Sequence, residues 1–481
     1  MNPQSQMSPH IPASEMAAPT ESSKSLGHVH FLGMGGVGVS AVARLMAADG
    51  VSISGTDAKE LPVLEEFRHA GAIVTIGYQA QNLAEIEAHT GRSITTVIAS
   101  SIAAAGNPEF DEAVRRGISI MHRSEGLAAL MRTRRSVAVA GTHGKTTTSS
   151  MATVLLEQAG LSPTFAVGAN VAGLGVNAAA GTGEWFIAEA DESDGSLLNY
   201  APEVGVITNV EPDHLDHYGT AEAVEQVFYD FTTRITDGGH LVLCRDDAGA
   251  ETLLQKVREP LAARGVTITT YGSHAEADLR LEHTADSETS VSEGGASVPL
   301  RLQVPGLHNQ LNALAAIAVG QRTGLTLREC AEAISEFQGT SRRFEFRGDV
   351  DGVRVYDDYA HHPTEVSAVL QAARSTLGKR PGRVHAIFQP HLFSRTAAFA
   401  SEFGRALEAA DTVTVLEIYP AREEPIAGVT AELLGHPVLT AAEAVHAVSS
   451  AASPGDIIMT LGAGDVTFLG AEILTALRAR R

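Results

Sequence analysis

The sequence predicts an α/β protein of three domains, each built on a mainly parallel sheet. Short β-rich apolar runs alternate with helical patterns along the chain, which is typical of parallel sheets covered by helices. The 481 residues are too many for one hydrophobic core and indicate roughly three domains of about 150 residues each. We expect a disordered tail over residues 1–25, followed by domains over 26–134, 135–340 and 341–481.

The expected strands follow one another in three blocks. They cover 28–32, 51–54, 73–76 and 97–99 in the first block, 137–140, 185–188, 204–208 and 240–243 in the second, and 353–356, 384–388, 412–416 and 457–461 in the third. The basic stretch 132–135 is expected to be an exposed linker between the first two blocks. Residues 282–297 are polar, contain two adjacent glycines, and are expected to form an irregular surface excursion.

The composition excludes several classes of partner and site. The chain carries 57 acidic against 35 basic residues, a formal net charge of −22, which disfavours binding to nucleic acid or to an anionic membrane. Cys244 and Cys330 are far apart, so neither a disulfide framework nor a zinc site is indicated, and a reducing cytoplasm fits. Residues 1–25 lack the apolar run of a secretory signal, and no stretch predicts insertion into a membrane.

A glycine-rich turn follows the first expected strand. Its glycines fit the pattern G-x-G-x-x-G before a helix of small residues, and Asp57 ends the next strand, where an acid would bind a ribose. The pattern predicts a site for a diphosphate without saying that a nicotinamide is attached. A tight turn that simply requires glycine is an equally good interpretation of the motif alone. The glycines are Gly33, Gly35, Gly36 and Gly38.

A second turn, after the strand that starts at Val137, predicts a nucleoside triphosphate site. Backbone N–H groups at such a turn point at phosphate oxygens, Lys145 neutralises charge near the β,γ-bridge, and the Thr146 hydroxyl is placed to hold Mg²⁺. The general phosphate-loop pattern needs glycine where this chain has Val139, so the loop is of an unusual, short-glycine kind. The nucleotide-binding residues expected here are Gly141, Thr142, His143, Gly144, Lys145, Thr146 and Thr147.

Acids and a histidine follow two further strands of the same block. Glu189 ends one expected strand, and His214 lies in the segment that follows the next. Because Mg²⁺ prefers carboxylate, hydroxyl and water oxygens, an acid of this group together with Thr146 makes a sensible metal site. Acid clusters are more often solvated loops, but this one follows a buried strand beside the phosphate loop.

Other polar groups cluster at the end of the second block and in the third. Asn309 and Asn312 lie one turn apart on one helix face, where Asn309 could cap the helix or the pair could bind an adenine edge. Arg342 and Arg343 stand at the expected hinge, suited to a phosphate. Two further polar segments follow strands, 357–363 with its paired histidines and 389–395.

Taken together, these motifs resemble the Mur ligase family over nearly all of residues 26–481. Several long motifs in the right order are far more specific than one glycine loop. They are GMGGVG at 33–38, AGTHGKTTT at 140–148, EADESD at 189–194, TNVEPDHLDHYG at 208–219, PGLHNQLNA at 305–313, SRRF at 341–344, DDYAHHP at 357–363 and FQPHLFSR at 388–395.

The resemblance implies a fold and an activity. The first and last domains would be Rossmann-like and the central one like a P-loop ATPase with a mixed or parallel sheet. The enzyme would use ATP to turn the lactyl carboxylate of UDP-N-acetylmuramate into an acyl phosphate, which the amine of L-alanine then attacks to form an amide. The reaction would belong to peptidoglycan precursor synthesis, would require Mg²⁺ as two ions, and fits a cytoplasmic monomer or homodimer.

The resemblance also assigns roles to residues. Lys145 would stabilise the transferring phosphoryl group, Thr146 and Glu189 would hold one Mg²⁺, and Glu189 with His214 another. The adenine nucleotide would contact Asn309, Asn312, Arg343 and Asp358. The amino-acid site would be framed by Tyr359, His361, His391 and Arg395, and the first glycine loop would bind the UDP diphosphate with Ser100 and Ser101 as nearby donors.

Two details separate this chain from other members of the family. No lysine occurs between Lys145 and Lys256, so the carbamylated lysine of ligases that add later residues is missing, which favours the alanine-adding type. Leu392 stands where some members have a basic residue, so glycine or serine could be accepted besides alanine. The rival hypotheses are a nicotinamide dehydrogenase, a nucleotide-regulated binding protein and a ligase that recycles a preformed tripeptide.

Overall fold

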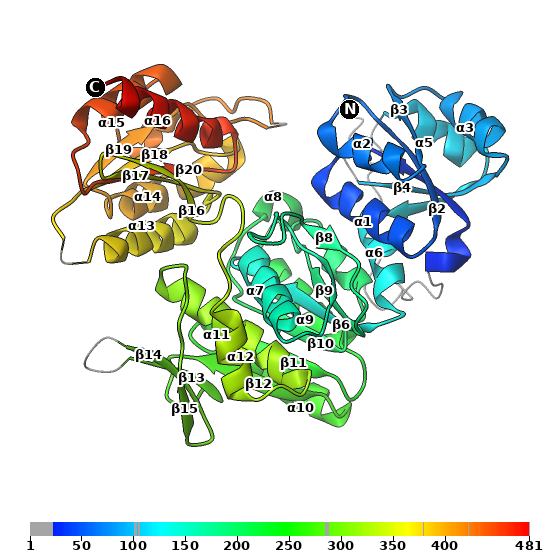
Figure 1. Ribbon diagram of the computed structural model, residues 1–481, viewed down its shortest axis with the longest axis horizontal. Coiled ribbons are helices and arrows are strands. Elements are labelled where there is room, and N and C mark those ends of the chain that lie inside the picture. Colours follow the sequence, from blue (N-terminus) through cyan, green and yellow to red (C-terminus); the bar gives the residue numbers. More distant parts are fainter. Residues whose placement is uncertain are drawn as a thin grey trace. The chain divides into compact units, whose positions relative to one another are not determined.

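The computed structural model describes residues 23–100, 103, 106–283, 288–378, 380–421 and 423–480, which form three sheets covered by helices (Figure 1). The chain divides into two compact units. The first unit comprises the described parts of 1–170, 175–299 and 314–333, and the second those of 171–174, 300–313 and 334–481. The expected α/β class with three sheets is therefore confirmed, whereas the domain boundaries remain a prediction.

The first sheet has five parallel strands in the order β3-β2-β1-β4-β5. These are β1 (His28–Leu32), β2 (Ser52–Asp57), β3 (Ile73–Ile76), β4 (Ile94–Ala99) and β5 (Ser119–His122). Its helices are η1 (Ser23–Leu26), α1 (Val37–Ala48), α2 (Pro62–His69), α3 (Asn82–Thr90), α5 (Pro108–Arg115) and α6 (Arg123–Met131). Apolar residues of α1, α2 and α6 pack on one face of the sheet, and those of α3 and α5 on the other. The strand order reverses at β1, where ligands of such sheets bind.

The second sheet has ten strands in the order β15-β14-β13-β12-β11-β10-β6-β9-β7-β8. They are β6 (Arg135–Ala140), β7 (Thr164–Ala166), β8 (Ala178–Ala179), β9 (Trp185–Glu189), β10 (Val204–Ile207), β11 (His240–Cys244), β12 (Thr267–Gly272), β13 (Leu279–His283), β14 (Thr289–Glu293) and β15 (Ala296–Pro299). Strands β9, β6, β10, β11 and β12 run parallel, and β13 to β15 add an antiparallel edge. The helices are α7 (Lys145–Gln158), η2 (Ser196–Asn199), α8 (Leu215–Tyr218), α9 (Ala221–Arg234), α10 (Ala248–Ala263), α11 (Leu307–Arg322) and α12 (Leu327–Ile334).

The third sheet, in the second unit, has the order β16-β17-β20-β18-β19, parallel except for β16. Its strands are β16 (Glu345–Val350), β17 (Val353–Asp358), β18 (Val384–Phe388), β19 (Thr412–Val415) and β20 (Ile457–Leu461). The helices are α13 (Pro363–Leu377), α14 (Phe393–Leu407), η3 (Ala431–Leu434), α15 (Ala441–Ala451), η4 (Asp465–Phe468) and α16 (Leu469–Ala479). Helices α13 and α14 pack on one face, α15 and α16 on the other.

Three expectations about local structure are wrong. The tail was expected to extend to residue 25, but Ser23 begins the short helix η1, where its side chain is buried and donates to Asp49. The stretch 132–135 is no exposed linker, because Arg135 starts β6, pairs with Glu203 and lies over the Trp185 ring. The described residues of 282–297 are not irregular, since they belong to the antiparallel strands β13, β14 and β15.

Candidate active site

The first glycine loop links β1 to α1 and is held by Asp57. The Gly35 N–H donates to Asp57 Oδ2 at 2.8 Å, and the Lys59 N–H donates to Oδ1 at 3.2 Å. A Cβ on Gly35 would lie 2.5 Å from Leu61 Cδ1, so only glycine fits there. Helix α1 starts after Gly36 with no side-chain cap, which leaves its first N–H groups available for an anion.

The structure describes the other residues expected at this site, except Ser101. Gly33 adopts the left-handed φ of +68° that its turn requires, and Gly38 lies in the first turn of α1. Ser100 is half-buried after β4, where its Oγ accepts from the Ala103 N–H at 3.3 Å. Ser101 lies outside the described residues. The binding of a diphosphate and ribose by this group remains a prediction.

The second glycine loop connects β6 to α7 and is pinned to the segment after β10. The His143 N–H donates to Asn209 Oδ1 at 2.8 Å, and the Glu211 N–H donates to Thr142 Oγ1 at 2.9 Å. Gly144 has φ +81° and precedes α7 without a side-chain cap. Val139, which stands where the general pattern has glycine, is a buried strand residue paired with Val206 and Glu189. The loop is short because β6 continues through that position.

Lys145 is enclosed by its own loop and by Glu192. Its Nζ donates to the carbonyl oxygens of Gly141 at 2.7 Å and Thr142 at 3.0 Å, and lies 2.8 Å from both carboxylate oxygens of Glu192. Burial alone would lower the pKa of Lys145, but the neighbouring Glu192 and Asp191 outweigh it and raise this pKa. The ammonium is therefore charged at neutral pH. We did not expect Glu192 in this role, although it lies within the EADESD motif.

Thr146 and Glu189 come together as the sequence predicts. The Thr146 hydroxyl donates to Glu189 Oε1 at 3.1 Å, and the Gly168 N–H donates to Oε2 at 2.8 Å. A Cβ on Gly168 would lie between 2.7 and 2.9 Å from these three oxygens, so a residue with a side chain would collide with them at this position. A hydroxyl and a carboxylate are oxygen ligands of the kind Mg²⁺ takes, so this donor set fits the ion.

His214 lies beside Glu192. Its Nε2 is 3.6 Å from Glu192 Oε1 and 3.7 Å from Asp213 Oδ2, and its φ of +54° turns the chain into α8. The Tyr218 hydroxyl of α8 donates to the Glu192 backbone oxygen, which joins this helix to the acidic segment. His214 thus lies next to the carboxylate of Glu192. The expected binding of Mg²⁺ by His214 together with Glu189 remains a prediction.

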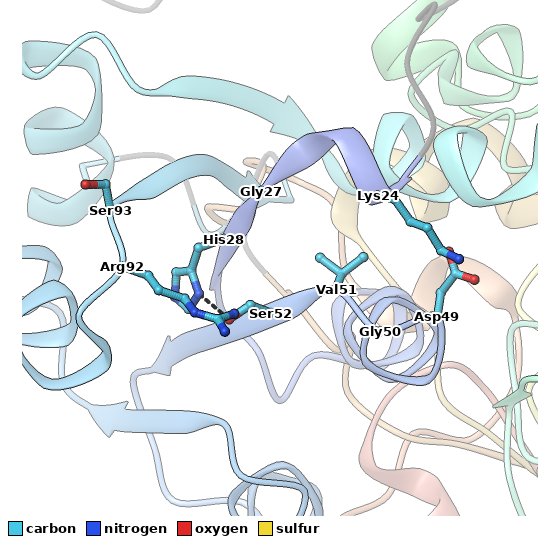
Figure 2. Close-up of a pocket in the computed structure, with 9 residues that line it drawn as sticks. All are labelled: Lys24, Gly27, His28, Asp49, Gly50, Val51, Ser52, Arg92 and Ser93. Atoms are coloured by element: carbon cyan, nitrogen blue, oxygen red, sulfur yellow. Dashed lines mark hydrogen bonds between the residues drawn. The ribbon is translucent and has the colours of Figure 1, made fainter.

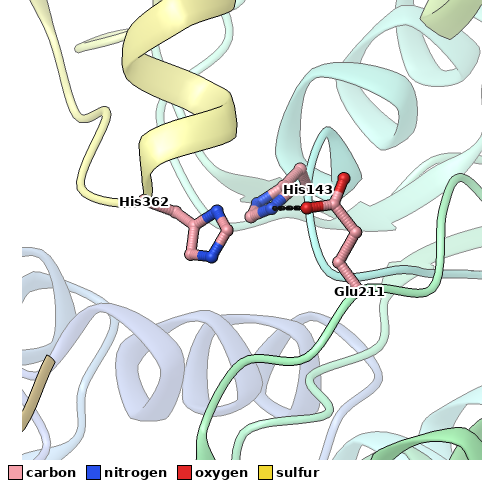
Figure 3. A group of neighbouring side chains, drawn as sticks. All are labelled: His143, Glu211 and His362. Atoms are coloured by element: carbon pink, nitrogen blue, oxygen red, sulfur yellow. Dashed lines mark ion pairs between the residues drawn. The ribbon is translucent and has the colours of Figure 1, made fainter. Parts of the chain in front are cut away.

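His143 forms an ion-pair contact with Glu211, Nε2 to Oε2, at 3.6 Å (Figure 3). Both residues belong to the first unit, at the rim of the phosphate loop. His362, drawn in the same figure, belongs to the second unit, where its side chain caps the start of α13. The buried Thr147 follows Thr146 in α7.

Arg123, at the start of α6, lies between the first turn of α1 and the acidic segment that follows β9. Its side chain lies alongside Gly38, whose added Cβ would be 3.2 Å from Arg123 Cδ, and its guanidinium donates to Asp191 Oδ2 at 3.1 Å. Burial opposes the charge of Asp191, but Lys145, Ser193 and Arg123 outweigh burial and hold the pKa of this carboxyl below its usual value. No sequence motif that we identified pointed to Arg123.

The two asparagines lie in the first turns of α11 and are buried. Asn309 does not cap the helix, because the helix starts at Leu307 and the Asn309 amide donates to the Pro305 carbonyl at 2.7 Å. The capping interpretation is therefore wrong, and the interpretation as adenine contacts remains a prediction.

Asp358 is buried at the end of β17. Its carboxylate accepts from the N–H groups of Phe344 at 2.7 Å and Ala360 at 2.8 Å. Burial is the largest influence and raises the pKa of Asp358 to about 6, although Arg343 opposes it. Arg343 also lies 3.9 Å from Glu365 and over the Tyr359 ring at 5.2 Å. The expected pair Arg343 and Asp358 therefore lies together in the second unit.

We expect Asp358 to make the stability of the protein fall as the pH rises from about 4 to about 6. In this window the unfolded carboxyl has lost its proton and the folded one still holds it, so raising the pH favours unfolding. The difference in unfolding free energy between the wild type and Asp358→Asn should change by about 3 kcal/mol and level off above pH 6. Denaturant titrations of both proteins at several pH values measure it. A constant difference would contradict the raised pKa.

The residues expected to frame an amino acid form a ring cluster in the second unit. The rings of Tyr359 and His361 are 5.2 Å apart, those of His361 and His391 6.2 Å, and His391 stacks on Tyr419 at 5.7 Å. Arg395 is buried in the first turn of α14. Tyr419 was not expected, because it lies on the segment after β19, outside every motif that we identified.

Models of the Mur ligase family match three consecutive parts of the chain. The family's catalytic domain matches residues 28–135, its middle domain 139–320 and its glutamate ligase domain 342–464. The chain therefore belongs to the Mur ligase family.

Three similar proteins are named for the same activity. The UDP-N-acetylmuramate–L-alanine ligase of Paenarthrobacter aurescens is 53% identical over 460 residues, 94% of this chain and 98% of its own. The enzyme of the same name from Arthrobacter sp. is 55% identical and covers 95% of this chain and 96% of its own. Among solved structures, the UDP-N-acetylmuramate-alanine ligase of Thermotoga maritima aligns with a TM-score of 0.73 and 26% identity over 94% of this chain and 100% of its own.

Proposed function

We propose that this protein joins L-alanine to the lactyl carboxylate of UDP-N-acetylmuramate and consumes ATP. The observation that carries this proposal is the 53% identity, over 94% of the chain, to a protein named for that reaction. The phosphate loop supports it independently, because a lysine and a hydroxyl–carboxylate pair are what a phosphoryl-transfer site needs.

The chemistry proceeds in two steps. A carboxylate oxygen attacks the γ-phosphorus of ATP, so the bond to the bridging oxygen breaks, ADP leaves, and an acyl phosphate forms. The amine of alanine then attacks the acyl carbon, and the tetrahedral intermediate collapses to an amide while phosphate leaves and the amine loses a proton. Lys145 stabilises the charge on the transferring phosphoryl group in the first step, which is its role in this proposal.

Magnesium has a suitable donor set in the first unit. Thr146 and Glu189 would hold one ion, and Glu189 with His214 a second, with Glu192 standing beside His214. When bound, the ions would screen the repulsion between ATP and the attacking carboxylate. The Gly168 N–H also holds Glu189 in place.

The roles that we propose for the other residues follow from the resemblance of their motifs to those of the family. Gly33, Gly35, Gly36 and Gly38 would bind the UDP diphosphate, and Asn309, Asn312, Arg343 and Asp358 the adenine nucleotide. Tyr359, His361, His391 and Arg395 would frame alanine, with the Arg395 guanidinium as a partner for its carboxylate. Among the described residues no helix is long and apolar enough to cross a membrane. A cytoplasmic monomer or homodimer is the form that we propose.

Phosphate release tests the proposal directly. With UDP-N-acetylmuramate and ATP present, we expect L-alanine to stimulate release, and glycine or serine to do so more weakly. A parallel assay replaces alanine with a preformed tripeptide. Phosphate release with the tripeptide and not with alanine would assign the protein to peptide recycling. If no amino acid or peptide stimulates release, the proposed function is wrong.

Arg395→Lys is expected to raise the KM for L-alanine by about tenfold to a hundredfold, because lysine keeps the charge but loses the paired contacts of a guanidinium. The KM for ATP should change little. Arg405→Lys, on the same helix but exposed beside Glu402, is the matched control. Steady-state kinetics with each substrate varied in turn measure the effect. Equal changes for all three substrates would contradict a local role.

A further inference from the structure

A pocket of about 550 Å³ opens at the amino-terminal edge of the first sheet (Figure 2). It is lined by the start of β1, the connection from α1 to β2 and the connection from α3 to β4. The glycine loop lies at the other end of β1, about 16 Å away along a strand of this length. The pocket is therefore separate from the site assigned to the sugar nucleotide.

One end of the pocket carries positive charge and hydrogen-bond donors. The Arg92 side chain lies beside His28 and Ser52 in Figure 2, and His28 accepts or donates a hydrogen bond at 2.7 Å to the Ser52 hydroxyl. Arg92 makes no ion pair within the described parts of the chain. Lys24 and Asp49 lie at the opposite end, where Asp49 already accepts from the Ser23 hydroxyl.

These features are unusual for this chain. Its net charge is −22, yet the nine lining residues include two cations and one carboxylate. Gly50, with φ +84°, has no atom of the described residues within 4 Å of the position of an added Cβ. An arginine without a carboxylate partner, next to a serine hydroxyl, is the donor set that binds an oxyanion.

We propose that this pocket binds a small phosphorylated metabolite, with its phosphate at Arg92 and Ser52 and its polar body toward Lys24 and Asp49. Asp49 would accept from hydroxyl or amine groups of that body, which a bare anion lacks. The volume is in the range of small-molecule sites. The site is independent of the proposed ligase activity.

Buried side chains connect the pocket to the glycine loop. His28 Nε2 contacts Ser54 Oγ at 2.9 Å, Ser54 Oγ contacts His30 Nδ1 at 3.0 Å, and His30 Nε2 contacts Glu109 at 3.1 Å. Thr56 donates to Glu109 at 2.7 Å, and the Thr56 carbonyl accepts from the Met34 N–H of the loop at 3.0 Å. These contacts form a continuous chain of polar groups from the pocket to the first glycine loop, through which a ligand in the pocket would affect that loop.

His28 supplies a signal for binding. Burial lowers the pKa of His28, and His30 and Arg92 lower it further while Glu87 opposes them. A phosphate beside Arg92 offsets the positive charge and should raise this pKa. NMR titration of the His28 ring in the full chain, with inorganic phosphate as the first probe and ribose 5-phosphate as the second, follows both binding and the shift.

The test compares two variants of equal charge. Arg92→Ala should weaken phosphate binding about tenfold or more, whereas Arg115→Ala, which removes an exposed arginine paired with Glu112 on α5, should leave it unchanged. Lys24→Ala should weaken ribose 5-phosphate and spare inorganic phosphate. Acetate at equal ionic strength separates a phosphate site from a general carboxylate site.

Three outcomes would overturn the proposal: unsaturable shifts, equal losses in Arg92→Ala and Arg115→Ala, or acetate binding as well as phosphate. Saturable binding that only Arg92→Ala removes would support it. Thermal unfolding of each variant shows whether the fold is retained, and Ser52→Ala gives a second, uncharged test of the same end of the pocket. None of these measurements depends on ligase turnover.

Discussion

Lys145→Met is expected to lower the rate of ATP-dependent ligation by about a thousandfold or more. The phosphate loop itself holds the ammonium in place, with contacts of 2.7 Å and 3.0 Å to loop carbonyls. Without it the growing charge on the phosphoryl group loses its fixed partner, an effect that is typically worth factors of 10² to 10³ for a single donor and more for a charge. Single-turnover phosphate release with all substrates measures the loss.

The same substitution should also destabilise the protein, because it leaves the buried Glu192 without its ion-pair partner. Glu192 is 1% exposed and both of its carboxylate oxygens lie 2.8 Å from the lysine. Removing one partner of a buried pair costs about 3 to 5 kcal/mol. We expect the double variant Lys145→Met with Glu192→Gln to regain most of that stability and none of the activity.

This double variant separates the two roles of Lys145. Recovery of stability without recovery of turnover assigns the lysine to the reaction as well as to the fold. If the double variant turns over at the wild-type rate, the phosphoryl role is wrong. If Lys145→Met is as stable as the wild type, the buried pair contributes little to folding. Denaturant titration and single-turnover kinetics on the same preparations give both answers.

Gly141→Ala is expected to abolish ATP binding and to cost about 4 kcal/mol or more in unfolding free energy. An added Cβ would lie 1.9 Å from Thr208 Oγ1 and 2.9 Å from its backbone nitrogen, and the φ of +132° disfavours any L side chain. The backbone of β10 cannot move aside without breaking its pairing with β6. The loop must therefore rearrange. Nucleotide titration calorimetry and thermal unfolding measure the two effects.

Gly160→Ala is the control for this prediction. Gly160 has a φ of +74° but no atom within 4 Å of an added Cβ, so it carries the conformational strain without the collision. We expect a cost of about 1 kcal/mol and unchanged ATP binding. Equal effects of the two substitutions would show that backbone strain, and not the contact with Thr208, accounts for the loss at Gly141.

Much of the fold could be predicted because parallel strands are buried on both faces. The buried strands Val384–Phe388 and Ile457–Leu461 have the predicted bounds, since each is a short apolar run between turn residues. The region 282–297 was interpreted wrongly because its strands bury few side chains, such as Leu281, Val291 and Val298. Alternation in a half-exposed antiparallel edge looks much like a polar loop.

The site could be predicted where motif residues bind through their own backbone or their immediate neighbours. The loops at Gly33–Gly38 and Gly141–Thr146 belong to this group, because glycine at those places is required by turns within the same segment. Glu192, Arg123 and Tyr419 were missed, since each acts on a residue far away in sequence: Lys145, Asp191 and His391. Asn309 was open between two roles until its amide partner, Pro305, was seen.

The sequence by itself determined the class of fold, the two glycine loops and the family, because these depend on local periodicity and on motifs of residues that are neighbours in the sequence. Only the tertiary structure decided which carboxylate meets Lys145, which acid keeps its proton up to a pH of about 6, and which residues line the pocket at Arg92. Pairing and burial depend on distances between segments that lie far apart in the sequence. Hydrogen bonds and charges act over a few ångströms of space.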